Sequence, residues 1–147
     1  MTLRGSYSAR IDDRNRLKVP AEFRRTIESS WGSDVFVTSL TGQDVTIYPI
    51  AVWEEFEARL MKLPLMQPAR MRIQKVVNFF GKTQAIDAQG RVLIHSPLKE
   101  SASIGDEVMV LGYGNYLHVQ DAAKVQQDVT ASIESDLETL SQLWRNE

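Results

Sequence analysis

One short pattern occurs twice in this chain of 147 residues and limits what the chain can fold into. Residues 11–16 read Ile-Asp-Asp-Arg-Asn-Arg, and residues 86–91 read Ile-Asp-Ala-Gln-Gly-Arg. Both are Ile-Asp-x-x-x-Arg followed by an apolar run, and they lie 75 positions apart, from Asp12 to Asp87. Internal repetition is the signature of a duplicated architecture, so the sequence predicts two copies of one structural unit.

The similarity continues beyond the repeated pattern. Further segments match at offsets of 75, 73 and 72 residues: 17–19 with 92–94, 35–37 with 108–110, and 42–49 with 114–121. The drift falls between the second and third predicted strands, where loops vary in length. We therefore predict four parts: a first unit over 7–54, connecting helices over 55–82, a second unit over 83–126, and a C-terminal helix over 127–147.

Each unit is predicted to be mostly β-strand. Tyr7, Ala9 and Ile11 alternate with polar residues, which is the period of a half-buried strand. Asn15 and Gly90 occupy matching positions, and both residue types tolerate positive φ, which indicates a three-residue turn with a left-handed last residue. Such a unit buries too little to be stable alone. We expect the two units to pair about a pseudo-twofold axis and to share one core.

Helices are predicted around and between these strands. In residues 20–31, Phe23, Ile27 and Trp31 recur every four residues, and the segments 49–64 and 69–80 form two further helices. The C-terminal segment carries a regular apolar stripe: Val125, Val129, Ile133, Leu137 and Leu140. Such a stripe must be covered, either by the same chain or by a neighbouring subunit.

Composition excludes several classes of function. The chain has no cysteine, which suits a reducing cytosol, and its N-terminus lacks the apolar core of a signal peptide. No stretch approaches the length of a membrane span. The two histidines, His95 and His118, have no nucleophile or metal-ligand pattern around them. We expect a cytoplasmic, non-enzymatic protein without metal, cofactor or membrane partner.

Charge is distributed in blocks, although the formal net charge is only −2. Residues 1–26 hold seven Arg or Lys against three acids, and residues 70–100 hold six against two. Both basic blocks surround a copy of the repeated pattern, whereas residues 121–147 hold six acids against two bases. Chance could produce one such block, but the coincidence of both with the repeat favours a polyanionic partner.

The repeated Asp-x-x-x-Arg has two interpretations. It could simply close a turn, because the Asp can accept hydrogen bonds from loop amides and pair with the Arg, a surface pair that contributes about 0–1 kcal/mol. Turn closure does not require an Arg, however, and the guanidinium fork matches guanine O6 and N7 as well as phosphate. We predict that a basic set contacts DNA: Arg16, Arg91, Arg14, Arg10, Lys18 and Arg4. A second set orients them: Asp12, Asp87, Asn15 and Gly90.

The segments RGSYSARIDDRNRLKVPAEFR, IDAQGRVLI and EVMVLGYGNYLHV resemble the MraZ family of bacterial transcriptional regulators. The resemblance implies an α+β fold of two tandem SpoVT/AbrB-type swapped-hairpin units that form a pseudo-symmetric barrel with flanking helices. It also implies ring-shaped homo-oligomers that bind short G-containing direct repeats upstream of the division and cell-wall gene cluster, usually as repressors at the nucleoid. The family's DNA-contacting Arg corresponds to Arg16 and Arg91, and its partner Asp to Asp12 and Asp87.

A rival interpretation is a protein-binding module. AbrB-type units also occur in antitoxins, in which an acidic C-terminal segment wraps a toxin, and the acidic end of this chain would suit that role. The regular apolar stripe favours a packed helix instead, because toxin-wrapping tails tend to be extended.

Overall fold

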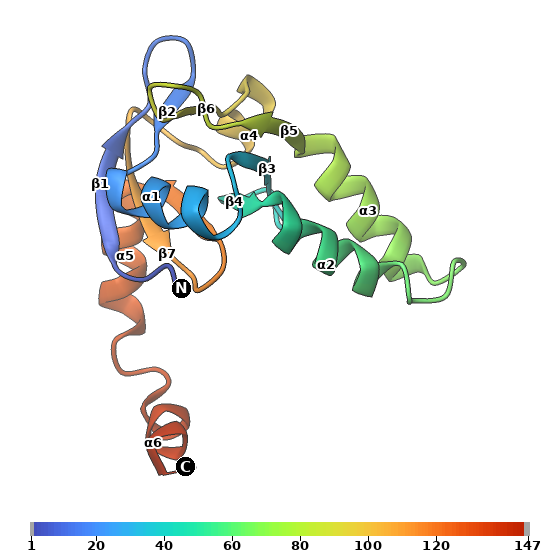
Figure 1. Cartoon of the computed structure of the whole chain (residues 1–147). Helices are drawn as coiled ribbons and strands as arrows, with labels where there is room; N and C mark the ends of the chain where they lie inside the picture. Colours follow the sequence, from blue (N-terminus) through green and yellow to red (C-terminus); the bar gives the residue numbers. More distant parts are fainter. Residues whose placement is uncertain (1, 146–147) are drawn as a thin grey trace.

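The computed structural model describes residues 2–145 and shows an α+β chain with antiparallel sheets and helices (Figure 1). The strands are β1 (Ser6–Arg10), β2 (Arg16–Lys18), β3 (Asp34–Thr38), β4 (Val45–Pro49), β5 (Lys82–Ala85), β6 (Arg91–Leu93), β7 (Glu107–Gly112) and β8 (Leu117–Asp121). The helices are α1 (Ala21–Ser30), α2 (Ile50–Leu60), α3 (Pro68–Phe80), α4 (Ser96–Ser101), α5 (Ala122–Ser132) and α6 (Leu137–Arg145). Helices therefore form at each predicted position.

The strand order shows how the two units interlock. The large sheet has six strands in the order β1-β7-β8-β4-β3-β5, and a small sheet pairs β2 with β6. The repeat relates β1 to β5, β3 to β7 and β4 to β8, so the order reads the same from either edge. The first strand of each unit pairs with the third strand of the other: β1 with β7, and β5 with β3. The predicted pseudo-twofold pairing is confirmed.

The expected barrel is not a closed one within the described residues. β1 and β5 end the large sheet as edge strands, while β2 and β6 leave it to form their own sheet. A single bridge, Ile11 with Leu17, joins β1 to the chain segment of β2. Between β5 and β6, the side-chain amide of Gln84 bonds both the N–H (2.7 Å) and the C=O (3.0 Å) of Leu93. The side chain of Gln84 thus replaces the backbone hydrogen bonds that would pair β5 with β6 and continue the large sheet.

One core is shared by the two units. Its members from the first unit, Leu17, Val19, Phe23 and Ile27, each have a partner 75 residues later: Val92, Ile94, Leu98 and Ala102. All eight are at most 3% exposed. The alternating residues of β3, β4, β7 and β8 complete this core from the large sheet. Neither unit could bury these side chains by itself, which explains why the chain requires both copies.

The opposite face of β3 and β4 carries a second, aromatic cluster of Phe36, Tyr48, Trp53 and Val77. Phe36 stacks on Trp53 with ring centres 4.6 Å apart. This cluster anchors α2 and α3 (50–80), which project from the body as a helical hairpin that we call the arm (Figure 1). Gly81 ends the arm where only glycine fits, because a Cβ there would lie 2.4 Å from the carbonyl oxygen of Val77.

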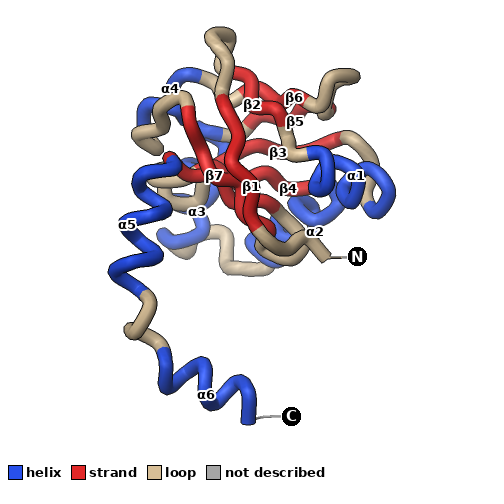
Figure 2. The backbone as a smooth tube through the Cα atoms, turned by 90° about the vertical axis from the view of Figure 1, so that its left-hand side faces the viewer, coloured by secondary structure: helices blue, strands red, loops and turns tan. Residues whose placement is uncertain are grey.

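A single C-terminal helix was expected over 127–147, but the structure shows two helices there. Residues 146–147 lie outside the described part of the chain. Helix α5 packs against β7 and β8, a turn covers 133–136, and α6 follows as a separate helix (Figure 2). Glu134, Ser135 and Asp136 interrupt the apolar residues there, and α6 extends away from the body. We call residues 122–145 the tail. Among residues 2–145, no helix is long and apolar enough to cross a membrane.

The hydrogen bonds of Gln84 can be tested together with the equivalent position in the first unit. Ala9 corresponds to Gln84, and a hollow lined by Ala9, Lys18 and Val19 lies where the amide would reach. Gln84→Ala should lower the free energy of unfolding by about 1 kcal/mol, since two exposed hydrogen bonds are lost. Ala9→Gln should raise it by a smaller amount by bonding the Lys18 backbone. Urea unfolding measures both; an unchanged midpoint for Gln84→Ala would show that the bridge stabilises nothing.

Candidate nucleic-acid interface

The two Asp-x-x-x-Arg turns have the same backbone hydrogen bonds. Asp12 N–H donates to Arg16 C=O at 2.9 Å, and Asp87 N–H donates to Arg91 C=O at 3.1 Å. In each turn, one carboxylate oxygen of the Asp accepts the N–H two residues on and that of the Arg, all at 2.9 Å. Asn15 has φ 61° and Gly90 φ 81°, so the predicted left-handed residue is confirmed in both turns.

The arginines leave these turns onto one face of the β2–β6 ribbon. In its register, Arg16 lies opposite Leu93, and Lys18 lies opposite Arg91, on the face away from buried Leu17 and Val92. A surface hollow is lined by residues of both turns: Arg10, Ile11, Asp12, Asp13, Arg16, Lys18, Arg91 and Asp106. The fold therefore brings together cations that are 75 residues apart in the sequence, on an antiparallel ribbon.

The two arginines are held differently. Arg16 Nε donates to Asp12 at 3.2 Å, which fixes the direction of a side chain that is about one third exposed. Arg91 donates instead to the side chain of Gln89, within its own turn. The first turn has Asp13 at the residue after the Asp and Arg14 where Gln89 stands, so it lacks this acceptor. The two turns thus have the same backbone hydrogen bonds, but their guanidinium groups bond different side chains.

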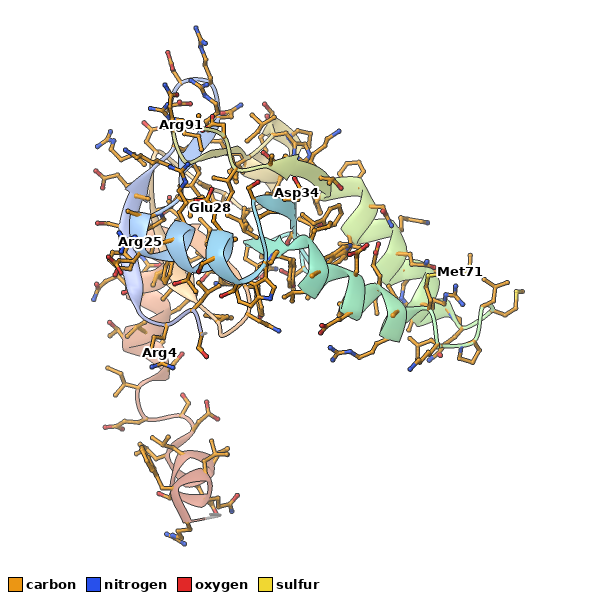
Figure 3. All side chains as sticks on the ribbon, in the orientation of Figure 1. Arg4, Arg25, Glu28, Asp34, Met71 and Arg91 are labelled. Atoms are coloured by element: carbon orange, nitrogen blue, oxygen red, sulfur yellow. The ribbon has the colours of Figure 1, made fainter. Side chains whose placement is uncertain are left out.

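The remaining predicted contacts divide by position. Arg14 and Lys18 are exposed at the turn and on the ribbon. Arg10 lies next to the hollow but pairs with Glu107 at 3.3 Å, and both side chains are more than 70% exposed. Arg4 precedes β1, at its other end, and Figure 3 shows it far from Arg91. The structure does not bring Arg4 to the site.

Two residues that contact the turns were absent from the sequence-based prediction. Arg24 in α1 donates to the carbonyls of Asp87 (3.3 Å) and Ala88 (3.4 Å), so the helix of the first unit holds the turn of the second. Lys99 in α4 lies 3.5 Å from Asn15 Oδ1 and holds the first turn in return. Arg24 and Lys99 are 75 residues apart, and this offset within the repeat was the signal that could have identified them.

The electrostatics of the turns favour charged carboxylates. The backbone N–H of Arg16 is the largest influence on Asp12 and lowers its pKa; desolvation opposes this, and the Arg14 N–H and the Arg16 charge lower the pKa further. The pKa of Asp87 is lowered mainly by the Arg91 N–H. Both aspartates are therefore favoured as anionic acceptors of the turn hydrogen bonds.

His118 lies away from this site, whereas His95 follows β6 and precedes α4. His118 Nε2 is 2.7 Å from Asp44 Oδ2, and its ring stacks on Tyr113. Burial alone would raise the pKa of Asp44, but hydrogen bonds from His118, Ser39 and Thr41 outweigh it, so the pKa is lowered. Ser39 donates to Asp44 rather than to the imidazole, which is not the order a serine nucleophile requires. The pair joins the 39–44 loop to β8.

The fold and the site together define a class: duplicated α+β proteins whose two units exchange their first strands and present paired arginine-bearing turns. Comparison with known proteins identifies the family. The family described as "MraZ protein, putative antitoxin-like" matches residues 2–76 and again 79–142, which gives two repeats. The chain belongs to the MraZ family of transcriptional regulators.

Individual relatives are similar in sequence to this chain over most of their length. The protein named transcriptional regulator MraZ from Koribacter versatilis is 41% identical over 143 residues, which is 95% of this chain and 97% of the relative. That from Acidobacterium capsulatum is 40% identical over 86% of both chains, and that from Nitrosomonas europaea is 32% identical over 82% of both. Membership of this non-enzymatic family confirms the prediction that the chain is not an enzyme.

The cross-unit clamp predicts a local effect. Arg24→Ala removes two hydrogen bonds to the 87–91 turn, and each contributes about 1 kcal/mol, so amide exchange at Gln89 and Gly90 should accelerate roughly thirtyfold. Arg25→Ala is the matched control, because Arg25 on the same helix pairs with Glu22 and, among the described residues, makes no hydrogen bond to the turn. Hydrogen exchange followed by NMR would contradict the clamp if both variants exchanged at the wild-type rate.

The aspartate pKa values predict how stability depends on acid. In the folded protein, the pKa values of Asp12 and Asp87 lie below the ordinary value of 3.8. The two ionised carboxylates therefore stabilise the fold above pH 3.8, and this stabilisation is lost as the pH falls through the folded pKa values. The double variant Asp12→Asn/Asp87→Asn should lose less stability than the wild type between pH 5 and pH 3. Urea midpoints at the two pH values measure this; equal losses would show that the carboxylates do not stabilise the turns.

Proposed function

We propose that this chain regulates transcription by binding double-stranded DNA with the outer face of the β2–β6 ribbon. The observation that carries the proposal is the convergence of Arg16 and Arg91 on one hollow, together with Lys18. A two-stranded ribbon fits the major groove, which is about 12 Å wide, and Arg is the side chain that recognises guanine O6 and N7 bidentately. The apolar inner face of the ribbon supports this use, because Leu17 and Val92 fix it to the core.

Two kinds of contact are proposed for the cations. Arg16 and Arg91 reach base edges, each oriented by its turn, and Asp12, Asp87, Asn15 and Gly90 hold the backbones. A second group contacts phosphates at the flanks: Arg14, Lys18 and Arg10. Phosphate contacts position a protein without reading sequence. The exposed Arg10–Glu107 pair is weak enough to open when a phosphate approaches, since such pairs contribute about 0–1 kcal/mol.

The finer proposal follows the family resemblance. The DNA target is a set of short G-containing direct repeats upstream of the division and cell-wall gene cluster, where binding represses transcription in the cytoplasm at the nucleoid. The exchange of β1 and β5 between units supports an AbrB-type swapped-hairpin arrangement. A ribbon that reads one or two bases discriminates by only about 1–3 kcal/mol per base, so several copies of the chain must act on several repeats, as a ring-shaped homo-oligomer would.

Gel shifts with arrays of one to four repeats test this proposal. Arg16→Ala and Arg91→Ala should each weaken binding roughly 5- to 150-fold, which corresponds to one lost base contact per copy, and more on longer arrays. Binding should fall steeply as salt rises, because the flanking cations release counterions from phosphates.

Arg4→Ala provides the matched control, because it removes an exposed arginine from the far end of β1. It should change binding less than twofold under the contact scheme above. Equal losses for Arg4→Ala and Arg16→Ala would mean that binding follows overall charge rather than the ribbon. Affinity independent of the number of repeats would contradict the use of several copies.

A further inference from the structure

The tail exposes an apolar stripe that no other part of residues 2–145 covers. In α6, Leu137, Leu140, Leu143 and Trp144 are 49–75% exposed, and Ile133 just before them is 67% exposed. α6 has nine residues, whereas isolated helices shorter than about 12–15 residues are marginal in water. Both views show α6 extending from the body beyond α5 (Figures 1 and 2). A short amphipathic helix of this kind is stabilised by whatever covers its stripe.

The arm exposes a complementary surface along α3. Met71 is 58% and Phe79 67% exposed, and Arg72 and Lys75 are exposed between them. Positions four apart share one helix face, so Met71, Lys75 and Phe79 form an outward stripe, while Val77 faces the body. Figure 3 shows Met71 near the outer end of the arm. Three more apolar side chains are exposed where α2 turns into α3: Met61, Leu65 and Met66.

The two surfaces lie in segments of opposite charge, although three glutamates of α2 precede the basic segment, and Lys124 and Arg145 border the acidic one. Residues 58–86 contain six bases and no acid: Arg59, Lys62, Arg70, Arg72, Lys75 and Lys82. Residues 125–144 contain four acids and no base: Asp128, Glu134, Asp136 and Glu138. Three of these acids lie at 134–138, directly beside the apolar stripe of α6. Opposite fields around apolar patches steer association and suppress other pairings.

We infer that the end of the tail (residues 133–144) docks on the outer face of α3 of a second copy of this chain. Figure 1 shows α6 and the arm extending in different directions from the body, so the two surfaces of one chain do not meet. The contact is head-to-tail: each copy uses its tail on one neighbour and its arm on the other, and association continues until a ring closes. The inference concerns the self-association in the proposed function and is independent of DNA contact.

A second copy fits the arm better than the other occupants do. DNA would be attracted to Arg72 and Lys75, but the exposed Met71 and Phe79 on either side of them offer nothing to phosphates. The acidic tail would be repelled by DNA, so the two surfaces cannot share that partner. An unrelated protein would have to match the arm and the tail separately, whereas each surface already has its complement on the same chain.

Charge reversal tested in trans separates contact between copies from contact within one. The arm variant is Arg72→Glu/Lys75→Glu, and the tail variant is Asp136→Lys/Glu138→Lys. Each variant alone brings like charges together and should self-associate roughly tenfold more weakly. An equimolar mixture restores opposite charges at every junction, so it should recover the wild-type mass in sedimentation velocity without DNA. Arg4→Glu/Arg25→Glu has the same charge change as the arm variant, on exposed residues elsewhere, and should assemble normally.

Two sedimentation results would contradict the contact between the tail and α3. Wild-type assembly of each single variant would show that these surfaces are not in contact. Two dissociated variants that stay dissociated when mixed would show that the charges act within one chain or on another partner. Circular dichroism on each variant checks folding, and all four substituted side chains are exposed. Because no DNA is present, failure here leaves the Arg16 and Arg91 contacts to be judged by the gel shifts.

Engineered cysteines give a second, direct measurement, because the chain has no cysteine of its own. Met71→Cys in one tagged copy and Leu140→Cys in another should form a disulfide between copies on mild oxidation. Ser29→Cys, on an exposed position of α1, replaces Met71→Cys in the control and should not cross-link. Equal cross-linking in the control, or a disulfide within a single chain that carries both cysteines, would contradict the inference.

Discussion

The exchange of β1 and β5 between the two units is the constraint on which the rest of the structure depends. Each unit gives its first strand to the other, so β1 completes the sheet at β7 and β5 completes it at β3. The chain returns from β1 through the turn and pairs β2 with β6. Without this exchange, the eight equivalent core positions would be divided between two clusters that are too small to exclude water. The chain therefore needs both copies of the unit in order to fold.

The same exchange places the candidate site. Pairing β2 with β6 puts two turns that are 75 residues apart side by side, with their cations on the outer face and Leu17 and Val92 on the inner one. The clamps are exchanged as well, since α1 holds the second turn through Arg24 and α4 holds the first through Lys99. A rigid ribbon has already lost much of the entropy that a flexible basic loop would lose on binding. This rigidity is what a contact specified by only a few bases requires.

The sequence predicted the parts of the fold that follow from local pattern. Duplication, the left-handed Asn15 and Gly90, the turn aspartates and the α1 face all follow from spacing and residue type. The open sheet was not predictable, because alternation indicates strands but not that one bridge at Ile11 and one side chain, Gln84, replace the ladders between them. The interrupted tail was missed because the apolar spacing of four and three continues across residues 133–136, where the polar residues end α5. Arg24 and Lys99 were missed because their contacts lie across the repeat.

The central claim is that Arg16 and Arg91 meet guanine in the major groove. Replacing the guanines of one repeat by 7-deazaguanine removes the N7 acceptor and little else, so it tests that contact most directly. Wild-type protein should bind the modified repeat about tenfold more weakly, as expected for one lost partner of a bidentate pair, while the Arg16→Ala/Arg91→Ala variant should bind both repeats equally. Wild-type protein that does not distinguish the two repeats, or a double variant that still does, would contradict the claim.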